Sequence, residues 1–329
     1  MKPAFSVLFF TVLSGAGLGA LALLGALDLF AAFGASPSIA PVVMPGALAV
    51  ALAFVVSGLA SSTLHLANPR NAWRSATRWR TSWLSREAII SLVLILVASC
   101  YTLTCWLNAA PAMRLSLALC TLLTAWGTLY CTAMIYASLK PIRQWHTWRV
   151  PLNYLLLGHA SGALLVTAIV RATGHSSGAV IVIACALLIG AAAAKIEYWR
   201  YIASEAGVTT IERAIGVGHG VHGPAVPGRS GASTSVMAAR LFDSGHSRGT
   251  FLTREFLVTV SSRRRRWTQC VMWIGTFALP LAWLMVSAPR WPGALLAVGA
   301  SIIGLLAERW LFFADARHTV RLYHGDPRT

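Results

Sequence analysis

The chain has 329 residues and a formal net charge of +17, and 57% of its residues are hydrophobic whereas only 11% are charged. About a quarter of the residues in a typical soluble domain are charged, so the composition excludes an ordinary water-soluble fold. An excess of Lys and Arg can indicate nucleic-acid binding, but in so apolar a chain it first indicates membrane topology. We therefore predict an all-α, polytopic membrane protein that contacts membrane lipid and does not bind nucleic acid.

Apolar windows of about 19 residues predict one transmembrane domain, residues 1–329, with about eight helices. Each window is long enough to cross the hydrocarbon core of a bilayer. A cleaved secretory signal is an alternative for the first window, but its apolar run, residues 4–33, is too long for one. The spans are expected near residues 5–31, 45–66, 87–107, 113–139, 151–171, 178–201, 267–288 and 293–314.

The basic residues fall almost entirely on one side of this eight-span scheme. Of the 27 Lys and Arg residues, 24 lie on the side of the two termini, and only Arg114, Arg171 and Arg290 lie on the other. The positive-inside rule then predicts a bacterial inner-membrane protein with both termini in the cytoplasm. Residues 203–266 become a long cytoplasmic loop that ends in Arg263–Arg266, a topological anchor that also meets anionic lipid.

The motif inventory contains no complete enzyme or cofactor site. All six cysteines lie in or beside apolar runs without a CxxC pair, which argues against a disulfide framework, an iron–sulfur site or another metal site. Walker A, dinucleotide-binding, HExxH and nucleophile-elbow motifs are also missing. We therefore do not expect a self-contained enzyme.

The turn after the second span is the densest polar group near the membrane. Ionisable side chains at membrane depth are costly, so they are candidates for function. His65 could donate a hydrogen bond to a bound carbonyl or pass a proton, and the arginines could hold a head group or pair with a partner. Satisfaction of His65 by backbone or lipid, and a purely topological role for the arginines, remain alternatives. The candidate quinone-site residues are His65, Asn68, Arg70, Arg74 and Glu87.

Other polar residues inside the spans have plainer interpretations. His159 could be an axial haem ligand, but no second histidine lies at a matching depth in another span. Asp28 is expected at the membrane interface. Pairing within the chain or docking of a partner is expected for Glu197 near Lys195 and for Glu308 next to Arg309, with Asp315.

Three segments carry a resemblance to a known family. STLHLANPRNAWR, RWRTSWLSRE and ERWLFFADARHTVRLYHG resemble the DmsC-type membrane anchors of molybdopterin oxidoreductases, and the chain is most similar to the SoeC-type anchors of cytoplasmic sulfite-oxidising complexes. The resemblance implies a complex with a catalytic molybdopterin subunit and a ferredoxin-like iron–sulfur subunit, in which the anchor exchanges electrons with membrane quinone and carries no cofactor of its own. By motif, His65 is similar to the quinone-site histidine of the family, and Arg70, Arg74 and Glu87 match by position.

The leading functional hypothesis is a quinone-reactive anchor of a sulfite:quinone or dimethyl sulfoxide/quinol type complex. A secondary transporter and a structural anchor without quinone chemistry are the alternatives. Classical dimethyl sulfoxide reductase anchors are drawn with both termini outside the cytoplasm, so the substrate and the direction of electron flow stay open. The residues expected to dock a partner subunit are Arg78, Arg80, Arg86, Arg143 and Arg149.

Overall fold

The computed structural model describes residues 4–34, 39–64, 69–175, 178–205, 260–286 and 291–324. Over these ranges every regular element is helical, and eight helical spans are long and apolar enough to cross a membrane, which confirms the predicted all-α bundle. One span, Ser262–Met285, consists of α9 (Ser262–Trp273), the π-helical turn η2 (Ile274–Ala278) and α10 (Leu279–Met285). The others are α1 (Phe5–Ala32), α2 (Met44–Thr63), α3 (Trp83–Trp106), α4 (Pro111–Ala137), α5 (Arg149–Ala172), α6 (Gly178–Glu205) and α11 (Trp291–Ala314).

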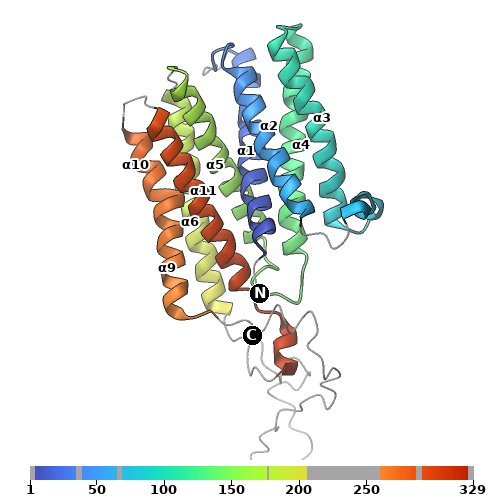
Figure 1. The fold of residues 1–329 in the computed structure, drawn as a ribbon, viewed down its shortest axis with the longest axis vertical. Helices are drawn as coiled ribbons and strands as arrows, with labels where there is room; N and C mark the ends of the chain where they lie inside the picture. The colour runs from blue at the N-terminus through green and yellow to red at the C-terminus, as the bar shows by residue number, and fades with distance from the viewer. Residues whose placement is uncertain are drawn as a thin grey trace, which may run out of the picture.

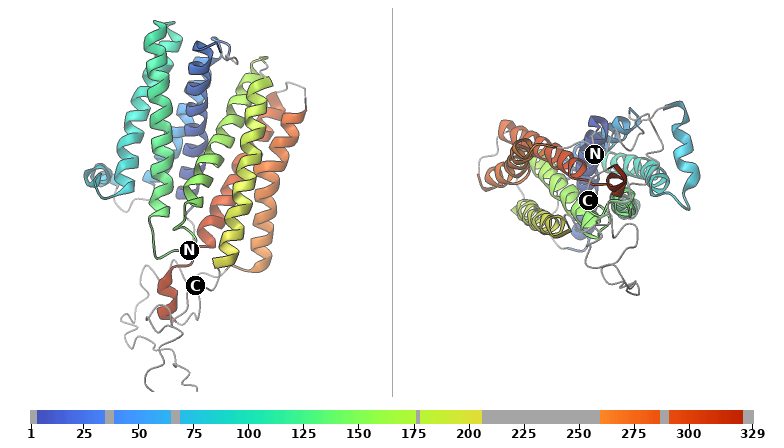
Figure 2. Two further views of the ribbon diagram at one scale, coloured as in Figure 1. Left: turned by 180° about the vertical axis from the view of Figure 1, so that it is seen from behind. Right: turned by 90° about the horizontal axis from the view of Figure 1, so that it is seen from below.

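Helices α1 and α5 form the centre of the bundle. In their apolar stretches 78% and 72% of the residues are buried, against 28% in α6. Helices α2 to α4 gather beside α1, whereas α6 and α9 to α11 lie on the side of α5 (Figures 1 and 2). The outer helices therefore present most of the lipid-facing surface, and the polar groups of the core lie where α1 and α5 meet their neighbours.

The crossing of α1 and α5 has room only for glycine at its closest point. A Cβ atom on Gly19 would lie 2.0 Å from the carbonyl oxygen of Gly158, and one on Gly162 would lie 2.2 Å from the backbone nitrogen of Ala20. Small residues let two membrane helices approach to backbone contact, where dispersion replaces the missing hydrophobic driving force. This contact sets the position of α5 and of the polar side chains that it carries.

A proline accounts for the π-helical turn in the span Ser262–Met285. The ring of Pro280 opposes the carbonyl group of the residue four positions earlier, Thr276, which lies inside η2. Widening the helix to a π turn relieves that conflict. At the same level a Cβ atom on Gly304 of α11 would lie 2.3 Å from the backbone nitrogen of Thr276. The irregular turn is thus accommodated by close packing against α11.

One end of the bundle carries most of the described positive charge, and we call it the basic end. It contains the start of α1, the 3-10 helix η1 (Pro69–Arg78), the connection 138–148, the start of α9 and the 3-10 helix η3 (Thr319–His324) (Figure 1). The described arginines of the opposite end are Arg114 and Arg171. The eight spans therefore bring the start of α1 and the helix η3 to the same end of the bundle.

The helices on either side of the predicted loop 203–266 are longer than their apolar windows. Helix α9 begins at Ser262, because the side chain of Ser261 accepts a hydrogen bond from the backbone N–H of Arg264 at 3.4 Å. Arg263–Arg266 consequently lie in the first turns of a helix. An apolar window stops at the first charge, whereas a helix does not. Residues 206–259 of the predicted loop lie outside the described residues.

Candidate functional site

The helix η1 and the turn that follows it, residues 79–82, present neighbouring tryptophan and arginine side chains at the basic end. Trp73 and Trp79 are exposed, and the guanidinium groups of Arg74 and Arg80 lie 5.6 and 5.4 Å from the centres of their respective indole rings. Such Trp–Arg pairs suit the lipid head-group region, where one part of the side chain is apolar and the other is wet. The predicted site residue Arg70 is exposed on the same element, whereas His65 and Asn68 lie outside the described residues.

Arg86 holds the junction between η1 and α3. Its guanidinium donates hydrogen bonds to the backbone carbonyls of Trp79 at 2.9 Å and Arg80 at 2.7 Å, and it lies 4.3 Å from the centre of the Trp83 ring. These contacts satisfy two backbone carbonyl groups in the turn after η1, where no helical hydrogen-bond partner is in place. Although Arg86 is a predicted docking residue, much of its hydrogen-bonding capacity is used inside the chain.

Arg149 is also engaged within the bundle. Its Nε and Nη2 atoms lie 3.0 and 2.8 Å from Oε1 of Glu197, and its guanidinium lies 4.6 Å from the centre of the Tyr201 ring. Glu197 therefore pairs with Arg149 on α5 and not with Lys195, because residues two positions apart on a helix point in different directions. The other predicted docking residues, Arg78, Arg80 and Arg143, are exposed at the basic end.

Glu87 lies inside the bundle. It is 4% exposed, and its carboxylate accepts a hydrogen bond from the hydroxyl of Thr132 on α4. The fold aims it inward because α3 begins at Trp83, capped by Ser82, and turns this residue of its second turn toward α4. The exposed arginines of η1 and the buried Glu87 therefore occupy different environments at the same end of the protein.

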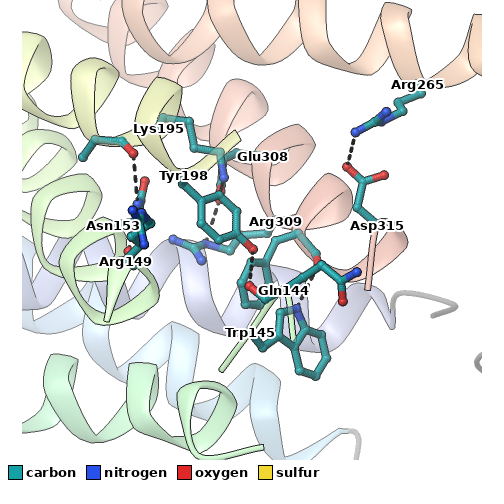
Figure 3. Close-up of polar contacts among 12 residues, drawn as sticks. Gln144, Trp145, Arg149, Asn153, Lys195, Tyr198, Arg265, Glu308, Arg309 and Asp315 are labelled. Carbon is teal, nitrogen blue, oxygen red and sulfur yellow. Dashed lines mark hydrogen bonds and ion pairs between the residues drawn. The ribbon is translucent and has the colours of Figure 1, made fainter. Parts of the chain in front are cut away.

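Lys195 on α6 and two residues of α11, Glu308 and Arg309, form a buried ion cluster at the basic end (Figure 3). Lys195 and Glu308 are each 1% exposed and Arg309 is 4% exposed. The Lys195 ammonium contacts Oε1 of Glu308, and Nε of Arg309 lies 3.0 Å from Oε2 of the same carboxylate. Because two cations share one carboxylate, the ion cluster carries a net charge of +1.

The connection between α4 and α5 closes over the ion cluster. The Tyr198 hydroxyl donates to the carbonyl of Gln144 at 3.0 Å, and the indole N–H of Trp145 donates to the carbonyl of Phe312 at 3.1 Å (Figure 3). Trp145 also stacks on the Phe312 ring with centroids 5.2 Å apart. These contacts separate the buried charges from the basic end's surface, so the ion cluster is held in an apolar aromatic shell.

A groove of about 580 Å³ opens beside this closure at the basic end. Gln144, Arg265, Asp315 and Arg317 contribute to its lining. Arg265 and Asp315 form an ion pair at 3.0 Å, so the predicted pairing of Asp315 is with a residue of α9 (Figure 3). Polar and apolar side chains both line the groove, and they come from the 138–148 connection, the end of α6, the start of α9 and the end of α11.

Asp28 is buried among the helices at the opposite end of the bundle, and its position at the depth of the membrane interface stays a prediction. Its carboxylate is 3% exposed, accepts a hydrogen bond from the Tyr101 hydroxyl at 2.7 Å and pairs with Arg114. The position of Asp28 near the end of α1 suggested the interface. In the structure, α3 and α4 pack around its side chain. A carboxylate in this place needs both partners, because burial of an unpaired charge is costly.

Both ring nitrogens of His159 are hydrogen-bonded within the bundle. Nε2 accepts from the indole N–H of Trp126 at 2.8 Å, and Nδ1 lies 2.7 Å from the carbonyl oxygen of Leu155. The imidazole is therefore held as the neutral tautomer with its proton on Nδ1. Its one lone pair is occupied by Trp126, which leaves none for ligation of a haem iron.

The described part of the chain contains no group of three or more His, Cys, Asp and Glu side chains that could hold a metal ion. The polar chemistry of these residues is thus one of hydrogen bonds and ion pairs. It is concentrated at the basic end, around Glu87 and the ion cluster, with a smaller group around Asp28 at the other end.

The sequence matches the family model for the DMSO reductase anchor subunit (DmsC) over residues 1–221. The chain belongs to the DmsC family. The sulfite dehydrogenase C subunit of Allochromatium vinosum is 32% identical over 342 aligned positions, which cover 98% of this chain and 99% of that protein. The resemblance predicted from three sequence segments, including the similarity to anchors of sulfite-oxidising complexes, is confirmed.

In this DmsC-family chain the sequence reasoning missed the neighbours of Glu87. Thr132 lies 45 positions away on α4, and no motif connects the two residues. The ion cluster left a stronger signal, because Lys195 and the adjacent Glu308 and Arg309 all lie near the same end of predicted spans. The sequence alone does not show that α6 and α11 bring these residues into contact.

Proposed function

We propose that this membrane anchor of an oxidoreductase docks a ferredoxin-like iron–sulfur subunit, and through it a molybdopterin catalytic subunit, and passes electrons from sulfite to membrane quinone. The observation that carries the proposal is the match to the sulfite dehydrogenase protein of Allochromatium vinosum, which extends over 98% of this chain and 99% of that protein. A match of this extent includes all eight spans, so it supports a common role for the whole bundle.

The basic end is the docking surface in this proposal, and it faces the cytoplasm of a bacterial inner membrane. The exposed arginines Arg78, Arg80 and Arg143 lie there, beside the groove lined by Gln144 and Arg317. Clustered arginines attract and orient a partner that carries acidic side chains. The opposite end has few cations, which agrees with the positive-inside rule.

Quinone reacts at the same end in this proposal. Quinone takes up two electrons and two protons when it is reduced. His65 donates a hydrogen bond to a quinone oxygen, with Asn68, Arg70 and Arg74 holding the head group, and Glu87 exchanges protons from inside the bundle. The support is the location of η1, because the exposed Trp73 on η1 and Trp79 directly after it are typical of the head-group level of the membrane.

The test is purification of the native complex, followed by assays with sulfite and either a quinone analogue or an artificial dye as the electron acceptor. We expect two partner subunits to copurify, and we expect His65→Ala to lower quinone-linked turnover at least about tenfold while dye-linked turnover stays unchanged. His175→Ala is the matched control, because His175 is exposed at the opposite end. Unchanged quinone-linked turnover in His65→Ala, or the absence of sulfite activity, would contradict the proposal.

A further inference from the structure

A small, partly enclosed cavity lies between α1, α4, α5 and α11, beside the Thr132 side chain that contacts Glu87. Its volume is about 20 Å³, and its polar lining includes Thr132, Tyr154, Ser161 and Arg309. A cavity needs roughly 10–15 Å³ of probe-occupied volume and two or more polar partners to hold a water molecule. This cavity meets both conditions for one water.

Tyr154 supplies an independent indication of such a water. Its side chain is only 4% exposed, and its hydroxyl makes no hydrogen bond of good geometry with the described residues, although the Arg309 and Tyr136 side chains lie near enough to interact with it. A buried hydroxyl without a partner is costly, and ordered water commonly satisfies such groups. The Arg309 guanidinium lies 3.7 Å from the centre of the Tyr154 ring, so the residue with the unpaired hydroxyl also touches the ion cluster.

Thr132 has two hydrogen-bond acceptors for one hydroxyl proton. Its Oγ1 atom contacts Oε1 of Glu87 and lies 3.0 Å from the carbonyl oxygen of Thr128. When Glu87 is ionised, the hydroxyl donates to the carboxylate. When Glu87 is protonated, the carboxylic acid donates to Oγ1 and the hydroxyl turns to the Thr128 carbonyl. Both protonation states of Glu87 are therefore hydrogen-bonded without any movement of the backbone.

The ion cluster supplies the charge that an ionised Glu87 would balance. Lys195 and Arg309 carry two positive charges and Glu308 one negative charge, all buried. A buried cluster with uncompensated charge is costly in a low-dielectric interior. Glu87 is joined through Thr132 to the same cavity that Arg309 lines. Its carboxylate brings the sum of these four groups to zero.

Few other charges surround Glu87. Helix α2 carries no titratable side chain, and the arginines of η1 are exposed. Arg86, the neighbour of Glu87 on α3, is bonded to the Trp79 and Arg80 carbonyls. Cys131 and Tyr136 on α4 and Tyr154 on α5 interact electrostatically with Glu87, and Arg309 on α11 lines the same cavity as Thr132.

We propose that Glu87, Thr132 and a water molecule in this cavity form a buried proton-exchange site whose occupancy is coupled electrostatically to the Lys195–Glu308–Arg309 ion cluster. The site takes one proton onto the Glu87 carboxylate and releases the same proton to water, with no change of oxidation state. It deepens the proposed function, since a proton held at Glu87 is available to a quinone bound at the basic end. Proton exchange at Glu87 can nevertheless be measured without quinone.

The first experiment is infrared spectroscopy of the purified complex as a function of pH, which follows the carbonyl stretch of a protonated carboxylic acid. Glu87→Gln identifies the band that belongs to Glu87. Thr132→Val keeps the shape of the side chain but removes the donor to the carboxylate, so the band should persist to a pH about one unit higher. Thr132→Ser keeps the hydroxyl and should titrate as the wild type does.

The second experiment tests the coupling by changing the charge of the ion cluster. Glu308→Gln makes it more positive, so the Glu87 band should disappear at a lower pH. Lys195→Met makes it neutral, so the band should disappear at a higher pH. Each shift should be of the order of one pH unit, the size expected for one unit charge acting on another across a protein interior with an effective dielectric constant near 20. The double variant restores the net charge and should titrate close to the wild type.

Shifts in opposite directions, cancelled in the double variant, are expected only if the ion cluster and Glu87 interact through charge. Shifts in the same direction, or a band that Glu87→Gln leaves unchanged, would overturn the proposal. If a charge variant does not assemble, the Thr132→Val and Thr132→Ser pair decides, and equal titration of these two variants would also overturn it. Failure of quinone-linked turnover with an intact Glu87 titration would count against the proposed function alone.

Discussion

The guanidinium of Arg309 lies face-on over the ring of Tyr154, 3.7 Å from its centre, and both side chains are almost fully buried. The contact joins α11 to α5 at the basic end. Nε of the same guanidinium also lies 3.0 Å from Oε2 of Glu308. A planar guanidinium can stack on a ring and meet a carboxylate at its edge at the same time, which a lysine ammonium cannot do. This relationship links the aromatic shell of the basic end to its buried charges.

Arg309→Lys should destabilise the bundle although it keeps the charge. The loss of a desolvated cation–π contact and of the fixed guanidinium geometry costs about 2 kcal/mol. Thermal unfolding of the purified complex in detergent measures the effect. Tyr154→Phe, which retains the ring, should keep most of the stability, whereas Tyr154→Leu should lose it. Equal stability of the Phe and Leu variants would show that the ring does not hold Arg309.

Gly162→Ala should weaken the crossing of α1 and α5. A Cβ atom at this position would lie 2.2 Å from the backbone nitrogen of Ala20, and backbone cannot move aside as a flexible side chain can. Overpacking of this kind costs about 1–3 kcal/mol. Gly15→Ala is the matched control on α1, because a Cβ atom at Gly15 would meet nothing within 4 Å. Thermal unfolding should separate the two variants, and a stable Gly162→Ala protein would contradict the close crossing.

Asp28→Asn should destabilise the protein more than Tyr101→Phe does. The first change removes the charge that pairs with Arg114, whereas the second removes one hydrogen bond, worth about 1–3 kcal/mol to a charged acceptor. Both residues lie at the end opposite η1, so quinone-linked turnover per assembled complex should stay unchanged in Tyr101→Phe. A large loss of quinone-linked turnover in Tyr101→Phe without a loss of assembly would indicate that the redox chemistry takes place at that end.

The membrane itself explains why the eight spans could be predicted from the sequence. A bilayer demands a run of apolar residues of nearly constant length, so hydropathy alone finds each helix, and the break at Pro280 changes the turn without ending the span. Side-chain partners follow a different rule. Asp28 and Tyr101, like Glu87 and Thr132, are brought together only by helix packing, which a window along one helix does not contain.

The candidate site was predicted as one group of residues, but its described members occupy two environments. Arg70 and Arg74 are exposed on η1, as expected for a turn at the membrane surface. Glu87 follows the same turn in sequence, yet the helical rotation of α3 points it toward α4. Proximity in sequence indicated the correct end of the bundle for all three. It could not indicate that Glu87, in the second turn of α3, faces the core.

Charge reversal of exposed arginines should test the basic end as the docking surface. Arg78→Glu together with Arg80→Glu should release the partner subunits at a lower salt concentration than the wild type. The double reversal weakens the electrostatic attraction to the partner, so less screening by salt is needed to separate the subunits. Co-purification of the partners on the anchor at rising ionic strength measures this. Arg149→Gln should have a smaller effect, since Arg149 is already paired with Glu197. If Arg149→Gln releases the partners and the double reversal does not, docking lies nearer to α5 than to η1.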